Sequence, residues 1–242
     1  MYSDNHLGRP VPAAKPAEAR RAPQPVAVRL HAFGRFRTEV DGAASPLPPL
    51  ATTVLARLVL ARGGLVHADT LYRDCWPDPV RIMRREHRVA VHKRIHMIRM
   101  CLAAGGRAPQ EVLFTERAAT TGYRLILDPN QVDIHRFEDL VWRAGAGWDN
   151  VAVDLLIQAL GLWRERPLLG LHDQDFVRAG AQHLAALRER ACRDLVSVSP
   201  ALGRTRDALH ALDRLQAAQP EDTALQQQVA AWRAELHVRA NR

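Results

Sequence analysis

Cysteine, acidic side chains and long apolar runs are all scarce in this 242-residue chain. The three cysteines, Cys75, Cys101 and Cys192, are odd in number and far apart, so neither a disulfide framework nor a paired-cysteine metal knuckle is expected. No apolar run approaches the roughly 20 residues that cross a bilayer, and no apolar stretch typical of a secretion signal follows the N-terminus. These absences predict a cytoplasmic protein that has free thiols and no membrane partner.

The sequence also lacks the short motifs of common catalytic sites. It contains no GxxxxGK[ST] or GxGxxG loop to bind phosphates, and no GxSxG, HExxH or paired CxxC. His92 and His96 stand four residues apart, close to His87, but no acidic or cysteine side chain at matching spacing completes a set of metal ligands. We therefore expect no enzyme activity, no cofactor and no bound metal.

Basic residues outnumber acidic ones by 34 to 26, a formal net charge of +8 with an isoelectric point near 10.3. Such a balance suits a polyanion, either nucleic acid or an anionic membrane surface. At 47% hydrophobic residues the chain can bury a core, and its length allows one or two domains. Residues 1–25 are rich in proline, alanine and arginine and poor in large apolar side chains, which predicts a disordered tail.

The stretch Met83–Leu102 is predicted to be an amphipathic basic helix. Val91, Ile95, Ile98 and Leu102 recur at helical spacing and form one narrow apolar stripe. No acidic residue follows Glu86 within the helix, so its basic side chains lack the counter-charges of an ordinary solvated face and favour an external anion such as duplex phosphate. The alternative is that a basic chain simply contains a basic helix. The side chains expected opposite the stripe are Arg85, Val89, His92, Lys93, His96, Met97 and Met100.

Periodicity and turn residues predict short strands, three helices and a hairpin before residue 128. The first expected elements are antiparallel strands within residues 26–40 and a helix that has Thr52 or Thr53 near its start and Gly63-Gly64 as its C-cap. They are followed by a helix Thr70–Trp76 capped by Asp69, the helix Met83–Leu102, and hairpin strands Val112–Thr115 and Tyr123–Leu127. This order is typical of a winged helix-turn-helix.

From Gln131 onward the periodicity is wholly helical. Asp149 or Asn150 is predicted to cap the second helix of this region, and a third is predicted from about Asp173. One short pattern occurs twice in this region: Asp154-Leu155-Leu156 followed by Pro167, and Asp207-Ala208-Leu209 followed by Pro220. The second copy lies 53 residues after the first at both the acidic residue (207 − 154) and the proline (220 − 167), which indicates a tetratricopeptide-like repeat. Pro200 predicts a break between residues 197 and 203.

On these residues the chain resembles the antibiotic-regulatory-protein (SARP-like) bacterial transcriptional activators. In that family an OmpR-like winged helix-turn-helix precedes a bacterial transcriptional activator domain. The resemblance runs from about Val26 to at least Gln219 and is carried by VRLHAFGRF, LARLVLARGGLVHADTLYRDCWPD, AVHKRIHMIRMCL, TTGYRLIL and DPNQVDIHRFEDL. It implies a mainly α fold with small β-sheets, that is, an α+β winged helix-turn-helix domain at residues 26–128 and an all-α, tetratricopeptide-like domain at residues 131–242.

The resemblance also implies where DNA would be contacted. The helix at about residues 83–102 would lie in the major groove, and the wing at residues 115–122 would touch the backbone or the minor groove. Met97 departs from the family by replacing an arginine that commonly reaches base edges. The expected contacts are Arg84, Arg85, Arg88, His92, Lys93, Arg94, His96, Met97, Arg99, Arg117, Thr120 and Thr121.

The function implied is a sequence-specific regulator of transcription that binds double-stranded DNA, acts as an activator and is located at the nucleoid. RNA polymerase or another regulator would be its protein partner. Its helical domain is expected to be shorter than in the family, with a homodimer formed through Leu225, Trp232 and Leu236. The alternative is a protein-interaction adaptor with weak DNA readout, because Met97 and Met100 replace basic residues.

Overall fold

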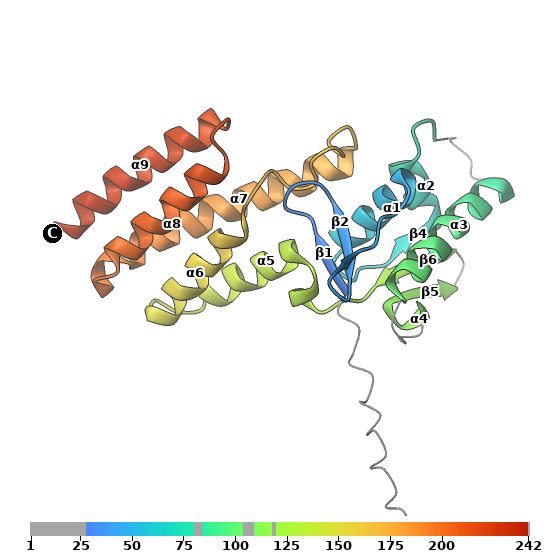
Figure 1. Cartoon of the computed structure of the whole chain (residues 1–242), viewed down its shortest axis with the longest axis horizontal. Helices are drawn as coiled ribbons and strands as arrows, with labels where there is room; N and C mark the ends of the chain where they lie inside the picture. Colours follow the sequence, from blue (N-terminus) through green and yellow to red (C-terminus); the bar gives the residue numbers. More distant parts are fainter. Residues whose placement is uncertain (1–27, 80–83, 104–108, 118–119, 242) are drawn as a thin grey trace, which may run out of the picture.

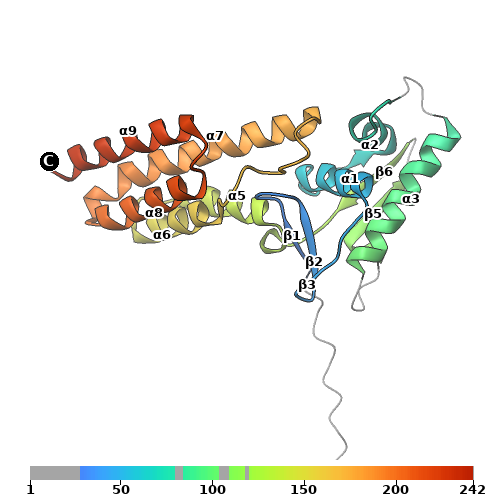
Figure 2. The same cartoon turned by 45° about the horizontal axis from the view of Figure 1, so that its top comes forward.

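The computed structural model describes residues 28–79, 84–103, 109–117 and 120–241, most of which are helical (Figure 1). The predicted disordered tail, Val26 and Met83 lie outside these ranges. A part built from short strands and helices is followed by stacked helices, and α3 lies at one end of the molecule with α9 at the other (Figures 1 and 2). Within the described ranges, no helix is both long and apolar enough to span a membrane.

The first sheet is an antiparallel meander of β1 (Val28–His31), β2 (Arg37–Val40) and β3 (Ala43–Ala44). Val28 pairs with Val40 across the first two strands. Asp41 and Gly42, which join β2 to β3, both have positive φ, as a tight hairpin turn requires. Val28 and Leu30 point into the core while Arg29 between them is exposed, which is the alternation expected of a sheet covered on one face.

Two helices then differ from the predicted boundaries. The first helix, α1 (Pro49–Leu60), begins at Pro49, so Thr52 and Thr53 lie near its start as predicted; proline suits this position because it needs no N–H partner in the first turn. It ends at Leu60, before the positive-φ turn at Arg62-Gly63. The next helix, α2 (Ala68–Cys75), places Asp69 inside its first turn instead of at the cap. A two-residue strand, β4 (Val66–His67), joins them and was not predicted.

The second sheet contains the hairpin. Its strands are β5 (Leu113–Arg117) and β6 (Thr121–Leu125), and β6 lies between β5 and β4. The first predicted strand starts one residue too early, because Val112 ends the short helix α4 (Pro109–Val112). The second predicted strand starts two residues too late. Together α1, α2 and α3 (Arg85–Leu102) pack on one another, and the hairpin packs beside them, so the winged helix-turn-helix is confirmed.

The remaining helices are α5 (Asp133–Ala144), α6 (Asn150–Leu162), α7 (Asp175–Val198), α8 (Thr205–Ala218) and α9 (Thr223–Ala240), with 3-10 turns η1 (Pro129–Gln131) and η2 (Pro200–Leu202). Asp149 caps α6, since its Oδ1 accepts a hydrogen bond of 2.8 Å from the Ala152 N–H. The predicted break at Pro200 is confirmed: α7 stops at Val198, and Gly203 after η2 has a φ of 69°.

The dimer contacts predicted on α9 are not available. Leu225 and Leu236 are fully buried, and Trp232 is only 7% exposed. Helix α9 packs against α7, α8 and η2, so the apolar stripe faces the chain's own helices. Helical periodicity identified this face correctly, but not the surface that covers it.

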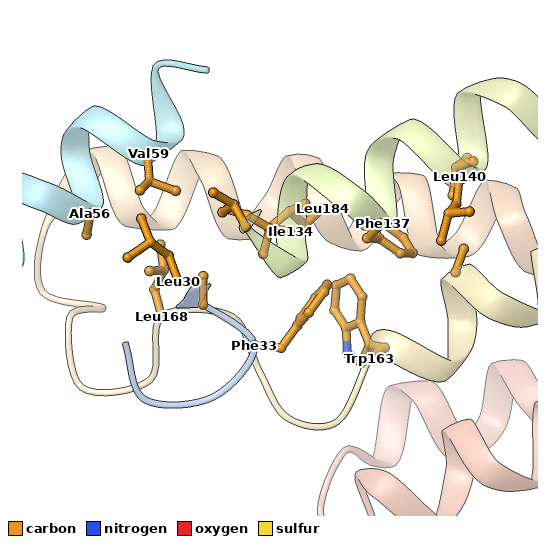
Figure 3. Packing of buried hydrophobic residues seen from close by; sticks show 14 of the residues in the cluster. Leu30, Phe33, Ala56, Val59, Ile134, Phe137, Leu140, Trp163, Leu168 and Leu184 are labelled. Atoms are coloured by element: carbon orange, nitrogen blue, oxygen red, sulfur yellow. The ribbon is translucent and has the colours of Figure 1, made fainter. Parts of the chain in front are cut away.

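A buried junction joins the two parts of the chain. The Phe33 ring lies 5.7 Å from that of Phe137 and 4.8 Å from that of Trp163, so the segment between β1 and β2, α5 and the end of α6 meet (Figure 3). The Asp133 carboxylate accepts hydrogen bonds from the backbone N–H groups of Ala32 (2.8 Å) and Phe33 (3.1 Å). Burial raises the pKa of Asp133, and the hydrogen bonds from these backbone N–H groups oppose that shift.

A second set of contacts lies between α1 and the helical part. His135 on α5 donates a 2.8 Å hydrogen bond from Nε2 to the carbonyl of Val59. Glu138, also on α5, is buried and pairs with Arg62 after α1 and with His183 on α7. Burial lowers the pKa of His135, which favours the neutral ring in the folded protein. The two parts therefore share one core and polar contacts on both sides of it.

Substituting Asp133→Asn tests this junction. An amide has one acceptor oxygen and adds an N–H group where the backbone already donates, so we expect the free energy of unfolding to fall by about 1–3 kcal/mol. Urea denaturation followed by circular dichroism measures the change. Asp139→Asn on the exposed side of the same helix is the matched control and should change stability by less than about 0.5 kcal/mol. Equal effects of the two variants would contradict the role of Asp133.

Candidate nucleic-acid interface

Burial of one side of α3 fixes which side faces solvent. Val91, Ile95, Ile98 and Leu102 are each at most 1% exposed, which confirms the predicted stripe. At the start of the helix, the Arg84 N–H donates a 3.0 Å hydrogen bond to Nδ1 of His87. The His87 ring lies 4.8 Å from the ring of Tyr72 on α2. The helix is therefore held both along its length and at its N-terminal end.

The opposite side of α3 is basic and exposed. Its exposed cationic or ionisable side chains form no ion pair with any residue in the part of the chain that the structure describes. Glu86 is the acidic residue of the first turn. A face of this kind has unopposed positive charge and attracts a polyanion. We call these residues the basic face: Arg84, Arg85, Arg88, His92, Lys93 and His96.

Apolar side chains lie among these cations. Val89 is 43% exposed and Met100 is 58% exposed, and each stands four residues from a member of the basic face, Lys93 and His96 respectively. Met97 is half-buried. The sequence analysis singled out Met97 as the departure from the family, but Met100 is the more exposed of the two methionines.

Arg99 was expected to contact DNA, but its guanidinium is turned toward β5. Its Nε and Nη2 donate hydrogen bonds of 2.9 and 2.6 Å to the carbonyl of Leu113, and Nη2 also donates to Oγ1 of Thr115 at 2.7 Å. Burial lowers the pKa of Arg99. The guanidinium thus ties α3 to β5. Arg94 is half-buried, and its Nε has no hydrogen-bond partner among the described residues.

The wing carries the remaining predicted contacts. Arg117 is exposed and pairs with Thr121 at the turn end of the hairpin. Oγ1 of Thr120 forms a 2.9 Å hydrogen bond with Nδ1 of His67, so this hydroxyl already has a partner in β4. Residues 118–119, at the tip of the predicted wing, lie outside the described residues. Arg117 and Thr120 are both exposed at this end of the hairpin, and of the two only Arg117 carries a charge.

Tyr123 was missed as a site residue. It is buried in β6, and the His92 ring on the basic face packs against its ring at 6.0 Å with an interplanar angle of 86°. Burial raises the pKa of Tyr123 to about 12, so the phenol stays neutral near neutral pH. Tyr123 therefore positions an exposed imidazole between α3 and the wing. Its place in the Gly122-Tyr123 end of the hairpin was the only sequence signal for it.

Three helices, a hairpin and an uncompensated basic face define the class of winged helix-turn-helix proteins, here with a helical domain attached. Residues 132–237 match the family model of the bacterial transcriptional activator domain. Transcriptional regulatory protein MoaR1 of Mycobacterium bovis (strain BCG / Pasteur 1173P2) and that of Mycobacterium tuberculosis (strain ATCC 25618 / H37Rv) are each 30% identical to this chain over 211 residues. The alignments cover 84% of this chain and 65% of each relative, so the chain spans about 65% of their length.

The fold is also similar to a solved structure, Mycobacterium tuberculosis EmbR in complex with a low affinity phosphopeptide. The TM-score is 0.58 at 22% identity, over 89% of this chain and 70% of that one. At this identity the likeness concerns the fold. Residues 132–237 therefore belong to the bacterial transcriptional activator domain family, and the chain as a whole is similar to the MoaR1 transcriptional regulators.

Replacing Arg99 tests its structural role. Arg99→Met keeps an apolar stem but removes the donors to Leu113 and Thr115, so we expect the free energy of unfolding to fall by about 1–3 kcal/mol. Arg88→Met, on the exposed side of the same helix, should change it by less than about 0.5 kcal/mol. Chemical denaturation of both variants gives the comparison, and a neutral Arg99→Met would refute the tie between α3 and the wing.

Proposed function

We propose that this protein is a sequence-specific regulator of transcription that binds double-stranded DNA through α3 and acts as an activator. The observation that carries the proposal is the basic face of α3, which is exposed and has no ion-pair partner among the described residues. The major groove of DNA is about 12 Å wide and admits an α-helix. The buried stripe leaves the basic face free to enter it.

Different side chains would serve different parts of the duplex. Arg84, Arg85 and Arg88 stand at the N-terminal end of α3, where a recognition helix usually meets bases and backbone. Lys93 lies near the middle and suits either a phosphate or the O6 and N7 acceptors of guanine. Arg117 on the wing would contact the neighbouring backbone. Val89 and Met100 would supply apolar contact with thymine methyl groups, whereas Arg99 is assigned to the scaffold.

The helical domain would supply the contact with a protein partner, RNA polymerase or another regulator. Trp142 at the end of α5 is 83% exposed, and Trp148 in the α5–α6 connection is 71% exposed. Exposed tryptophans are frequent energetic centres of protein interfaces. Val151 at the start of α6 is 62% exposed and enlarges this apolar surface. We also propose that the protein acts at the nucleoid and binds DNA as a homodimer. In this proposal residues 26–128 form the DNA-binding domain and residues 131–242 form the helical domain.

Salt-dependent DNA binding by a Lys93→Ala variant tests the basic face. An operator selected from random duplex DNA is titrated with full-length protein at several salt concentrations. The logarithm of the affinity should fall by roughly 0.9 for each phosphate contact per tenfold rise in salt. Lys93→Ala should weaken specific binding about 5- to 150-fold, as expected for loss of 1–3 kcal/mol, without loss of helical content.

The matched control is Arg206→Ala, which removes one exposed positive charge from α8 at the other end of the molecule (Figure 2). It should bind like the unaltered protein. In purified transcription with RNA polymerase, the unaltered protein should raise transcript from a template carrying the operator, and Lys93→Ala should lose this effect. Affinity independent of salt and unchanged by Lys93→Ala would instead favour the protein-interaction adaptor.

Met100→Ala tests the apolar contact separately from charge. We expect the loss of one buried thymine contact to weaken binding to the selected operator about 5-fold, corresponding to roughly 1 kcal/mol. Replacing individual thymines of the operator by uracil removes only the C5 methyl group. At the contacted position this replacement should weaken the unaltered protein but not Met100→Ala. If no thymine shows this dependence, Met100 does not read the sequence.

A further inference from the structure

A cavity of about 290 Å³ lies in the helical domain, remote from α3 in sequence and structure. Its wall is formed by α7, by the connection between α6 and α7, and by the turn between α8 and α9. Trp163, Pro167 and His172 come from the first connection, Arg188 comes from α7, and Gln219 comes from the turn. Neither DNA binding nor the exposed tryptophans involve this cavity.

Unpaired polar atoms are concentrated in the residues that line it. Nine buried side-chain nitrogen or oxygen atoms have no hydrogen-bond partner among the described residues, and five of them belong to four residues of this cavity. They are Nε1 of Trp163, Nε2 of His172, Nε of Arg188, and both amide atoms of Gln219. Buried polar groups are normally paired, so this concentration in one place points to a bound polar molecule.

Arg188 supplies a buried positive charge. Its side chain is 7% exposed and forms no ion pair within the described part of the chain. Asp222 is the acidic residue whose charge acts on it most strongly, but Oδ1 of Asp222 already caps α9 by accepting the Leu225 N–H at 3.0 Å. The guanidinium carbon lies over the Trp163 ring, 4.9 Å from its centre, in a cation–π contact that restrains the side chain. A buried, oriented and unpaired guanidinium is a strong site for an anion.

We propose that this cavity binds a small organic carboxylate. A carboxylate matches the planar fork of Arg188 in a bidentate pair, and the Gln219 amide and the Trp163 N–H provide further hydrogen bonds. Ala181, Ala185 and Pro167 line the cavity and would contact the hydrocarbon part of the ligand. Its volume is at the lower end of small-molecule sites, so the ligand is a small metabolite rather than a chain segment.

Thermal unfolding of the full chain tests the proposal with sodium benzoate, sodium succinate and sodium phosphate as probes at constant ionic strength. We expect a carboxylate to raise the Tm by about 2–8 °C at saturation, and phosphate to have little effect. Arg188→Met should abolish that rise. It should also raise the Tm of the protein without ligand, because it replaces an unpaired buried charge by an apolar side chain of similar length.

Arg193→Met on the exposed side of α7 is the control, since Arg193 pairs with Glu189 outside the cavity. It should keep the carboxylate response. A response retained in Arg188→Met, or a stabilisation by phosphate alone, would overturn the proposal. It would also be overturned if no probe shifted the Tm and a crystal structure showed ordered water on the Arg188 and Gln219 side chains.

Discussion

The contact on which the structure depends is the buried junction around Phe33. The segment after β1 is held from two directions: Asp133 at the start of α5 accepts the Ala32 and Phe33 N–H groups, and the chain after α6 adds a backbone ladder. In that ladder the Leu168 N–H donates to the Ala32 carbonyl at 2.7 Å, and the Gly34 N–H donates to the Arg166 carbonyl at 3.1 Å. The segment after β1 thus forms both backbone hydrogen bonds and ring contacts with the helical domain. The first sheet is therefore packed against the helical domain as well as against the winged helix. Helix α3 is therefore carried on one continuous core.

The basic face depends on this scaffold through a second, smaller set of contacts. Helix α3 is buried along one stripe, Arg99 fastens it to β5, and Tyr123 places its ring against His92. Unpaired charges on one face repel one another, so a helix with such a face needs attachments elsewhere to remain ordered. Arg99 shows the consequence most clearly, because a basic residue of the same helix is used for structure while its neighbours remain exposed. The division follows from which side of the stripe each residue lies on.

Local patterns were sufficient to predict much of this arrangement. The stripe of α3, the cap at Asp149 and the break at Pro200 depend on neighbours within a few residues, and each is present. The strand Val66–His67 was not predictable in this way, because it exists only through pairing with Gly122 and Tyr123, more than fifty residues later. For the same reason the partners of Arg99, and the helices that cover Trp232, could not be derived from periodicity. A helical pattern gives the buried face but not the surface that buries it.

Trp163 connects the junction to the cavity of the helical domain. Its ring packs against those of Phe33 and Phe137 (Figure 3). The guanidinium carbon of Arg188 lies over the same ring, 4.9 Å from its centre. The indole nitrogen is buried without a hydrogen-bond partner among the described residues, and Trp163 is one of the residues that line the cavity. A ligand that pairs with Arg188 and accepts the Trp163 N–H would restrain the same ring that holds Phe33 in place. A ligand that stabilises one arrangement of that ring would stabilise the junction as well. If DNA selects the same arrangement, linkage requires that DNA raise the affinity for the ligand by the same factor by which the ligand raises the affinity for DNA.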